Sequence, residues 1–326
     1  MRDLEPGGPV EILVLNWRDR SHPQGGGSEV FAETVADGLA ARGHRVTLFC
    51  AAHELAARES RSDHGVRIVR RGGRYTVYPL AALYYLTRRL GRPTVIVDVQ
   101  NGLPFFSRLW FRRRVVLVCH HVHREQWGVV MRAPLARIGW WIESWLSPRV
   151  YRGCQYVTVS DQSRAELVEL GVHAEDIAVV HNGVEAQDRV RQPSPTPTLV
   201  VLGRLVPHKR VEYALDAVAA LKDEFPALRL VIAGRGWWED EIRCHRDTLG
   251  LDEGDVAFAG YVTEADKSLL LESAWISLVP SLKEGWGISV MEAAAHGTPS
   301  IAFRSAGGVA ESVVDGYSGL LVDDHS

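Results

Sequence analysis

The chain has 326 residues, which is too many for one compact core and suits two domains of roughly 100–200 residues each. Apolar residues make up 46% and charged residues 24% of the sequence, near the globular averages, which excludes a disordered or fibrous protein. The net charge of −3 gives the whole chain no general attraction to nucleic acid, so we expect no nucleic-acid partner. The first residues lack the pattern of a signal peptide, and no stretch reaches the roughly 18 apolar residues of a membrane span, so we expect a cytoplasmic protein.

Short apolar runs alternate with longer amphipathic stretches in the first 184 residues, a pattern typical of βα units around a parallel sheet. The run at 11–17 predicts a buried strand. A glycine-rich loop at 24–29 follows it and leads into a helix from about Ser28 to Ala41, whose predicted apolar face is Phe31, Val35 and Leu39. Further strands are predicted at 45–50, 66–70, 94–99, 115–120, 155–160 and 177–183.

The composition changes at 185–198, which carries three prolines and few apolar residues. After it the strand series begins again, at 198–204, 229–234, 256–260, 275–280 and 300–303. We therefore predict an α/β protein of two facing, Rossmann-like, doubly wound domains, residues 1–184 and 199–326, joined by a linker at 185–198.

Segment 126–152 is rich in tryptophan and arginine: Trp127, Trp140, Trp141, Trp145, Arg132, Arg137 and Arg149. One interpretation is an interfacial helix that meets a membrane surface or a lipid-linked substrate. The other is a long helix that packs its aromatic rings on the sheet. We favour packing, because apolar faces interrupted by arginines are common in buried helices.

The four cysteines are far apart, with no Cys-x-x-Cys pair, so we expect reduced core thiols: Cys50, Cys119, Cys154 and Cys244. Three histidines follow the predicted strand at 115–120. Neighbouring His120 and His121 would point to opposite faces of a strand and could not easily hold one metal ion. We predict that one of them is a polar contact in a cleft, and we interpret His181 as a turn residue.

The densest chemical signal is the segment Leu-Lys-Glu-Gly-Trp-Gly-Ile-Ser-Val-Met-Glu beginning at residue 282. If Glu284 lies in a glycine-rich turn and Glu292 in the following helix, both carboxylates can point into one cleft. The first helical amides, around Gly285, Gly287, Ile288 and Ser289, would form an anion site. This combination suits a nucleotide sugar, whereas the alternative is a capped helix with two solvated glutamates. The spacing alone does not choose between them.

Two cations follow the predicted strand at 198–204. Arg204 ends the strand and Lys209 is predicted to open a helix. Such a pair suits neutralisation of a diphosphate leaving group, which would remove the need for a metal. The alternative is two ordinary surface cations. No Asp-x-Asp lies at a strand end, and the acidic run 239–241 is predicted to lie early in a helix.

The glycine-rich loop at 24–29 lets the backbone approach a ligand closely. It is not a P-loop, and Val30 takes the place of the last glycine of the dinucleotide fingerprint.

Taken in order, these motifs resemble the retaining glycosyltransferases of the GT-B fold, in the group-one type called family four. The resemblance covers nearly the whole chain and is most specific at 280–303. It implies that Glu284 contacts the sugar hydroxyls of a nucleotide-diphosphate sugar and Glu292 the ribose. It implies that Arg204 and Lys209 bind the diphosphate, with the amides of Gly287, Ile288 and Ser289.

The resemblance also assigns residues around the rest of the donor: Gly26, Gly27, His120, Gly236 and Val262. The two N-terminal glycines would approach the donor phosphates or the acceptor, and His120 would lie near the reacting sugar. Arg235 and Gly236 would form a turn near the nucleotide, and Val262 would border the base. The implied reaction retains the anomeric configuration and uses no metal or other cofactor. The acceptor would be a glycan, a lipid-linked precursor or a small molecule, and peripheral membrane contact is compatible with it.

The family's chains normally continue past the strand Gly-Leu-Leu-Val through further helices, so we expect the C-terminal helices here to be shortened or absent. Two other functions fit the same architecture: a sugar-nucleotide epimerase and a binding module for nucleotide sugars. An epimerase needs acid and base carboxylates in the first domain, for which Asp98 and Glu125 are the candidates. The motifs assign neither the donor base and sugar nor the oligomeric state.

Overall fold

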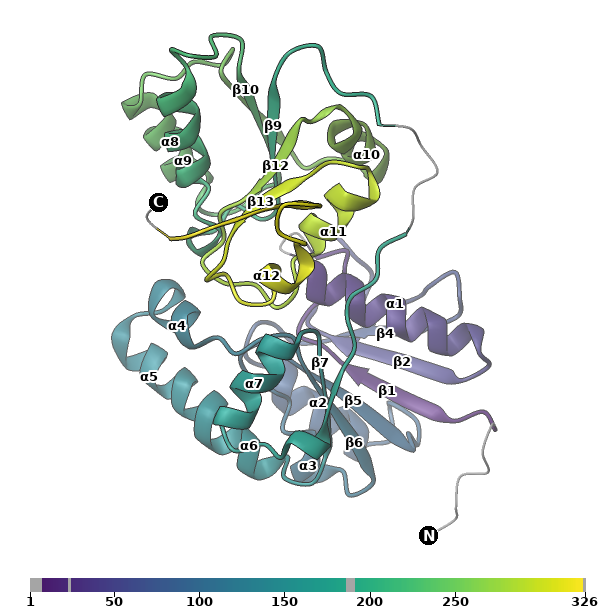
Figure 1. Cartoon of the computed structure of the whole chain (residues 1–326). Coiled ribbons are helices and arrows are strands. Elements are labelled where there is room, and N and C mark those ends of the chain that lie inside the picture. Colours follow the sequence, from purple (N-terminus) through teal and green to yellow (C-terminus); the bar gives the residue numbers. More distant parts are fainter. Residues whose placement is uncertain (1–7, 23–24, 186–190, 325–326) are drawn as a thin grey trace. The chain divides into compact units, whose positions relative to one another are not determined.

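The computed structural model describes residues 8–22, 25–185 and 191–324 (Figure 1). The chain forms two compact units. Unit 1 holds the described residues up to Trp127, with Ala133–Thr158 and Arg164–Val180, and unit 2 holds the remainder. The predicted glycine-rich loop at 24–29 and the predicted linker at 185–198 lie partly outside the described residues.

Unit 1 is built on an eight-stranded sheet with the order β3-β4-β2-β1-β5-β6-β7-β8. Every neighbouring pair is parallel except β3 with β4. The strands are β1 (Glu11–Leu15), β2 (Arg45–Cys50), β3 (Glu59–Arg61), β4 (Arg67–Arg70), β5 (Val95–Gln100), β6 (Arg114–Cys119), β7 (Gln155–Thr158) and β8 (Ile177–Val179). The strands predicted in this half are confirmed. The sequence did not predict β3, because Glu-Ser-Arg has no apolar alternation.

Both faces of this sheet are buried, which explains its continuous apolar strands. Leu13 and Leu15 of β1 belong to one core cluster, whereas Ile12 and Val14 belong to the cluster on the opposite face. Helix α1 (Gly27–Ala41) buries Ala32, Ala36 and two glutamates. Its predicted apolar face is correct for Phe31 and Leu39, which pack on the core, and wrong for Val35, which is exposed.

The remaining helices of the N-terminal half are α2 (Val77–Leu86), α3 (Ser107–Trp110), α4 (Arg124–Val130), α5 (Ala133–Trp141), α6 (Ser147–Val150), α7 (Asp161–Glu169), the π-helix η1 (Ile142–Leu146) and the 3₁₀ turn η2 (Ala174–Asp176). The tryptophan-rich segment is therefore several consecutive helices rather than one. The predicted packing holds for Trp140, which lies against the core, but Trp141 and Trp145 are exposed.

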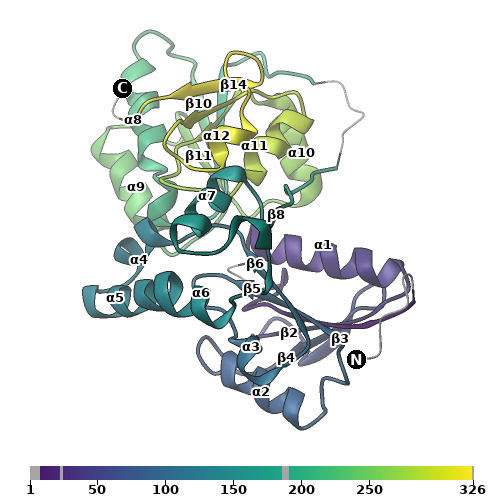
Figure 2. The ribbon, with the colours of Figure 1, turned by 60° about the horizontal axis from the view of Figure 1, so that its bottom comes forward.

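Unit 2 contains a six-stranded parallel sheet with the order β11-β10-β9-β12-β13-β14 (Figures 1 and 2). Its strands are β9 (Thr198–Leu202), β10 (Arg229–Ala233), β11 (Val256–Gly260), β12 (Ile276–Val279), β13 (Ser300–Phe303) and β14 (Gly319–Val322). Its helices are the 3₁₀ turn η3 (Pro207–Lys209), α8 (Glu212–Leu221), α9 (Glu239–Thr248), α10 (Glu264–Ser273), α11 (Ile288–Ala295) and α12 (Val309–Ser312).

The strand order of unit 2 reverses at β9. The chain builds outward from β9 to β10 and β11, and then β12 pairs with the other side of β9. In an open parallel sheet, this reversal leaves a crevice at the carboxyl ends of the two central strands, where ligands usually bind.

Cys50, Cys119 and Cys154 are buried, as predicted. The prediction is wrong for Cys244, which is exposed on α9, a helix whose one buried residue is Ile242. None of the helices in the described ranges combines the length and the apolar character that crossing a bilayer requires.

Candidate active site

Four predicted site residues of unit 2 follow four adjacent strands. Arg204 follows β9, Gly236 follows β10, Val262 follows β11 and Glu284 follows β12. Because the strands are parallel and adjacent, their carboxyl ends meet at one edge of the sheet. The sheet therefore collects these residues along a single edge, with β9 and β12 at the point where the strand order reverses.

Lys209 and Glu284, which are 75 residues apart in sequence, meet at this point. The Lys209 ammonium donates to a Glu284 carboxylate oxygen. Both side chains are about four-fifths buried, at 20% and 19% exposure. The contact joins the turn after β9 to the loop after β12, which are the two elements beside the crevice.

The prediction that Lys209 opens a helix is wrong. Lys209 ends the short 3₁₀ turn η3, and Arg210 then adopts a left-handed backbone with φ of 47° before α8 begins at Glu212. The left-handed conformation of Arg210 ends the turn. Lys209 is therefore the last residue of a short turn rather than the first residue of a helix, and its side chain contacts Glu284.

Glu284 is held in its ionised form. Burial raises the pKa of its carboxyl group, but the charge of Lys209, hydrogen bonds from Lys209 and Ser281, and the charge of His208 outweigh that effect. Its pKa therefore lies below the ordinary value for glutamate. A carboxylate at neutral pH accepts hydrogen bonds, as contact with sugar hydroxyls would require.

Arg204 differs from Lys209 because its guanidinium has no ion pair or side-chain hydrogen bond with any residue in the described ranges. The side chain is half-buried. Together with Lys209 it lines a narrow hollow between β9 and β12, formed by Val201, Leu202, Gly203, Arg204, Lys209, Val211, Leu278, Val279, Pro280, Ser281 and Ser289. A half-buried cation without a counter-ion is suited to binding an anion.

The turns after β9 and β10 touch through their backbones. A Cβ at Gly236 would lie 1.9 Å from the Leu205 carbonyl oxygen, and one at Gly234 would lie 1.8 Å from the Gly203 carbonyl oxygen. Only glycine permits this approach. The observed role of Gly236 is thus to hold the turn that carries Arg204 close to its neighbour, and Val262 is half-buried just beyond β11.

The loop after β12 leads into α11 as the sequence predicted. Gly287 is the N-cap residue, with φ of 88°, and α11 begins at Ile288. The Glu284 amide donates to the Ala306 carbonyl, and the Gly308 amide donates to the Glu284 carbonyl, both at 3.0 Å. The first amides of a helix have no intrahelical acceptor. The first turn of α11, including Ser289, lies beside Lys209, and amides in this position are suited to an anion.

Glu292 lies in the second turn of α11, but it does not share the partner of Glu284. Its carboxylate receives a 2.7 Å hydrogen bond from Lys267 of α10, and Lys267 also pairs with Glu264 at 2.7 Å. The two glutamates therefore have different lysine partners, and a ribose contact by Glu292 remains a prediction.

The sequence did not predict the contact between two aromatic side chains near this loop. The rings of His181 and Trp286 are stacked, with centroids 4.2 Å apart and planes 22° apart. His181 is therefore more than the turn residue we interpreted it to be, since it covers the indole of the Gly-Trp-Gly segment. The tryptophan within that motif was the signal that could have pointed to an aromatic partner.

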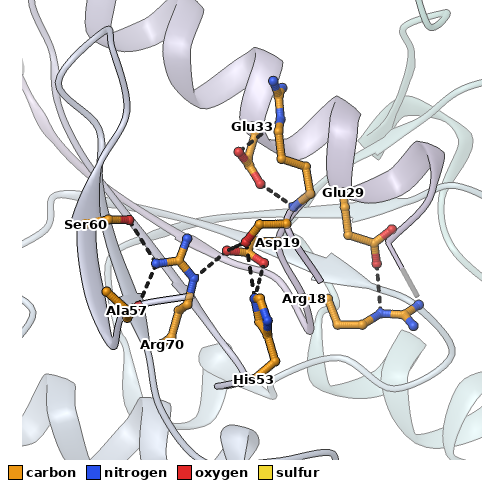
Figure 3. A network of polar contacts seen from close by, with 10 residues as sticks. Arg18, Asp19, Glu29, Glu33, His53, Ala57, Ser60 and Arg70 are labelled. Atoms are coloured by element: carbon orange, nitrogen blue, oxygen red, sulfur yellow. Dashed lines mark hydrogen bonds and ion pairs between the residues drawn. The ribbon is translucent and has the colours of Figure 1, made fainter. Parts of the chain in front are cut away.

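In unit 1, the glycine-rich loop is anchored by a buried glutamate. The Gly26 amide donates to Glu29 Oε2 at 2.8 Å. Arg18 Nε donates to Glu29 Oε1 at 3.2 Å, as Figure 3 shows. Gly27 is the first residue of α1. The Gly26 amide, predicted to approach a ligand, is thus directed at Glu29 in this structure.

A second set of buried charges lies beside this anchor (Figure 3). Asp19 accepts hydrogen bonds from Arg70 Nε at 2.5 Å and pairs with His53 Nε2 at 3.1 Å. Arg70 also donates to Ser60 and to the Ala57 carbonyl. All three ionisable side chains are at most 6% exposed. We call Asp19, His53 and Arg70 the Asp19 network.

His120 follows β6 and is buried, with its ring edge-to-face against Phe31 of α1 at 5.0 Å. Burial lowers the pKa of His120 to about 4. The imidazole is therefore neutral at neutral pH and can serve as a polar contact, but not as a strong general acid. His121 instead meets Gln126, with 3.2 Å between Nε2 and Oε1. Within the described ranges, no three acidic, histidine or cysteine side chains are grouped to hold a metal ion.

Asp98, one of the two candidate carboxylates for an epimerase, is not accessible to a substrate. Asp98 is fully buried, and its carboxylate accepts from the Tyr151 hydroxyl and from the amides of Phe105 and Ser107. Glu125, the other candidate, is exposed. A carboxylate enclosed by three donors braces the fold and has no access to a substrate.

Two family models match the chain. Residues 25–188 match Glycosyltransferase Family 4, and residues 185–326 match Glycosyl transferases group 1. The glycogen synthase of Mycobacterium tuberculosis strain H37Rv is 32% identical over 188 residues, which covers 55% of this chain and 43% of that protein. The chain therefore spans less than half the length of this relative.

Solved structures resemble the whole chain. A sucrose-phosphate synthase from Thermosynechococcus elongatus has a TM-score of 0.80 at 19% identity, covering 97% of this chain and 86% of that one. Anabaena HepE in complex with UDP-glucose has a TM-score of 0.72 at 18% identity, with the same coverage. At these identities the likeness concerns the fold, and it confirms the predicted pair of Rossmann-like domains of the GT-B class.

Proposed function

Because the chain belongs to glycosyltransferase family 4, whose model matches more than half of it, we propose that it is a retaining glycosyltransferase that needs no metal. In this proposal it moves a sugar from a nucleoside diphosphate sugar to a hydroxyl group of an acceptor. The observation that carries the proposal is the pairing of Lys209 with Glu284 beside Arg204, at the crevice between β9 and β12.

These three side chains suit a donor that is anionic at one end and rich in hydroxyl groups at the other. Arg204 and Lys209 would bind the diphosphate, helped by the first amides of α11. Glu284 would accept hydrogen bonds from the sugar hydroxyls, and Glu292 from the ribose. The complex of HepE with UDP-glucose supports this class of donor.

In the reaction, a bond forms between the acceptor oxygen and the anomeric carbon while the bond from that carbon to the diphosphate oxygen breaks. The electron pair of the broken bond stays on the diphosphate, and the proton of the acceptor hydroxyl passes to an oxygen of the departing diphosphate. Negative charge therefore grows on the leaving group, where two fixed cations lower the barrier. The same two cations supply the charge that a divalent metal would otherwise supply.

The acceptor would be a glycan, a lipid-linked precursor or a small molecule, and the reaction would take place in the cytoplasm. His120, neutral and buried, would contribute a polar contact near the transferred sugar, with Gly26 and Gly27 nearby. Val262 and Gly236 would border the nucleotide.

The decisive experiment measures turnover with a panel of nucleoside diphosphate sugars and acceptors, with and without a chelator. We expect Lys209→Ala to lower turnover at saturating donor by about 10²–10³-fold. Lys222→Ala is the matched control, because Lys222 also pairs with a carboxylate, that of Asp255, but is itself 40% exposed and does not line the hollow. NMR of the product should show the anomeric configuration of the donor, and the chelator should leave the rate unchanged.

Near-normal turnover of Lys209→Ala would contradict the role in leaving-group stabilisation. A changed sugar nucleotide in the absence of acceptor would identify an epimerase. Tight donor binding without transfer or slow hydrolysis would identify a binding module.

A further inference from the structure

Helix α5 and η1 expose a continuous row of large apolar side chains. Leu135, Ile138, Trp141 and Trp145 are 57%, 54%, 49% and 44% exposed. Their spacing of three, three and four residues places each next to the previous one on the helix surface. We call these four residues the apolar stripe.

The opposite side of the same helices already contributes to the core. Ala136, Gly139 and Glu143 are buried, and a Cβ at Gly139 would lie 2.4 Å from the Trp127 ring. Glu143 accepts from Trp127 Nε1 at 2.7 Å. The helix is therefore held in unit 1 by its other face, and the apolar stripe is not required for that packing.

The two tryptophans of the stripe are ordered against each other and against an arginine. Their rings are stacked with centroids 5.2 Å apart, and the Arg149 guanidinium lies 4.2 Å from the centroid of the Trp145 ring. Two stacked indoles beside a cation form the kind of surface found where proteins meet the boundary between water and lipid.

Arg149 also connects the stripe to a basic hollow. An open hollow of about 720 Å³ is lined by Arg108, Leu109, Arg112, Arg149 and Val150. Figure 2 shows α5 and α6 following one another, with α3 beside α6. We call the hollow lined by these five residues the arginine hollow. It lies at the end of the apolar stripe, and Leu109 at its margin is 68% exposed.

The sequence around both features is strongly basic. Residues 99–160 contain nine arginines, no lysine or aspartate, and two glutamates, a net charge of +7 in a chain whose net charge is −3. One of the two glutamates is the buried Glu143. The positive charge is thus concentrated in the segment that carries the stripe and the hollow.

We propose that the apolar stripe and the arginine hollow together dock unit 1 on an anionic lipid bilayer. The side chains of the stripe enter the interface between head groups and acyl chains, and the arginines bind lipid phosphates. A nucleic acid would account for the arginines but not for four exposed apolar residues in a row. A second copy of the chain would bring two segments of the same sign together, which like-charge repulsion disfavours.

The test is flotation of the full chain with two kinds of vesicle, pure phosphatidylcholine and phosphatidylcholine mixed with phosphatidylglycerol. We expect binding to the anionic vesicles that weakens as salt is added. Trp141→Ser with Trp145→Ser should weaken binding about tenfold or more, because binding scales with the apolar area that is buried. Arg108→Gln, Arg112→Gln and Arg149→Gln together should weaken it roughly 100-fold, since each arginine near an anionic surface contributes about a factor of five.

The controls make the same changes elsewhere. Trp237→Ser removes an indole that is 55% exposed, and Arg42→Gln, Arg61→Gln and Arg92→Gln remove three exposed arginines outside the segment. Both should bind vesicles as the wild type does. Brominated acyl chains should quench tryptophan fluorescence of the wild type and of Trp237→Ser, but much less that of the stripe variant.

Binding that is absent, or equally weakened by the controls, would overturn the proposal. Equal binding to both kinds of vesicle would also overturn it, because the arginine hollow would then have no role. A change of oligomeric state in the stripe variant without any vesicle binding would assign the surface to a second copy. Competition by RNA with no quenching by brominated lipid would assign it to nucleic acid. Circular dichroism of each variant separates these outcomes from unfolding.

Discussion

The two units both hold charged side chains beside the carboxyl end of their first strand, but in different ways. In unit 1, Asp19 and Arg70 are almost completely buried, and each is bound by several protein partners (Figure 3). In unit 2, Lys209 and Glu284 are about one-fifth exposed, and Arg204 has no side-chain partner among the described residues.

This difference separates charges that brace the fold from charges that are suited to a ligand. Buried ions must be matched completely, because an unpaired ion in the interior costs several kcal/mol. In the Asp19 network the carboxylate of Asp19 is paired with both Arg70 and His53, and Arg70 also donates to Ser60 and to the Ala57 carbonyl. In the crevice of unit 2, Arg204 has no side-chain partner among the described residues, and a diphosphate would supply the missing negative charge. The variants below test this contrast, beginning with the largest expected effect.

Asp19→Asn should disrupt the Asp19 network. The change removes the charge that faces Arg70 and His53, and loss of one partner of a buried pair typically costs about 3–5 kcal/mol of the free energy of unfolding. Asp216→Asn is the control, because Asp216 and its partner His245 are 47% and 33% exposed. Urea denaturation of the control should shift by less than about 1 kcal/mol. Equal shifts for the two variants would show that the network is not a structural brace.

Arg204→Gln should have the opposite effect to Asp19→Asn, because it should lower activity and leave stability nearly unchanged. Because the guanidinium has no partner among the described residues, the thermal midpoint should change little, whereas turnover at saturating donor should fall by about 10²–10³-fold. Arg229→Gln, an exposed arginine on β10, is the matched control for both measurements. A destabilised Arg204→Gln with normal turnover would place Arg204 with the bracing charges of unit 1 and would remove the contrast.

His120 makes the free energy of unfolding depend on pH. Its folded pKa of about 4 lies below the ordinary 6.5, so between these values the unfolded chain binds the proton and the folded chain does not. The contribution of His120 to stability is therefore complete above about pH 6.5 and falls with decreasing pH, by about 3 kcal/mol near pH 4.

This effect is measured as a difference between proteins, since other groups titrate over the same range. The stability advantage of the wild type over His120→Asn, from urea denaturation, should shrink by about 3 kcal/mol between pH 7 and pH 4. The same comparison with His64→Asn, at an exposed position, should stay constant. A constant advantage over His120→Asn would mean that His120 is accessible to protons in the folded chain.

The sheets could be predicted from sequence because their strands are continuous apolar runs that need no distant information. The edge strand β3 could not, since its three residues are polar and are held by pairing with β4. The same limit explains the tryptophan-rich segment. Spacing shows that Trp141 and Trp145 are neighbours, but only the packing of Gly139 against Trp127 determines which side of the helix remains exposed.

For the candidate site, residue types could be predicted and partners could not. Arg204, Lys209 and Glu284 stood out through their positions after predicted strands. Their meeting depends on β12 pairing beside β9, a long-range choice that local patterns do not contain. The glycine-rich loop shows the reverse case. Its glycines suggested an open anion site, whereas the buried Glu29 one turn later binds the Gly26 amide.

The smallest expected effect concerns Lys267. It is paired with two glutamates, as the buried charges of unit 1 are paired, but one of its partners is largely exposed to solvent. It bridges Glu264 and Glu292, with Glu264 88% exposed and Glu292 22% exposed. Burial lowers the pKa of Lys267, but hydrogen bonds from it to both glutamates outweigh this and raise the pKa, so it is charged at neutral pH.

Lys267→Gln should cost about 1 kcal/mol or less in thermal denaturation, because Glu292 remains accessible to water after the lysine is lost. Glu264→Gln should change stability even less. If Glu292 binds the ribose, Glu292→Gln should raise the KM for the donor more than Lys267→Gln does, because Lys267 acts only by orienting the carboxylate. Equal KM values for Glu292→Gln and the wild type, with a loss of stability in both Glu292→Gln and Lys267→Gln, would make the pair a brace between α10 and α11.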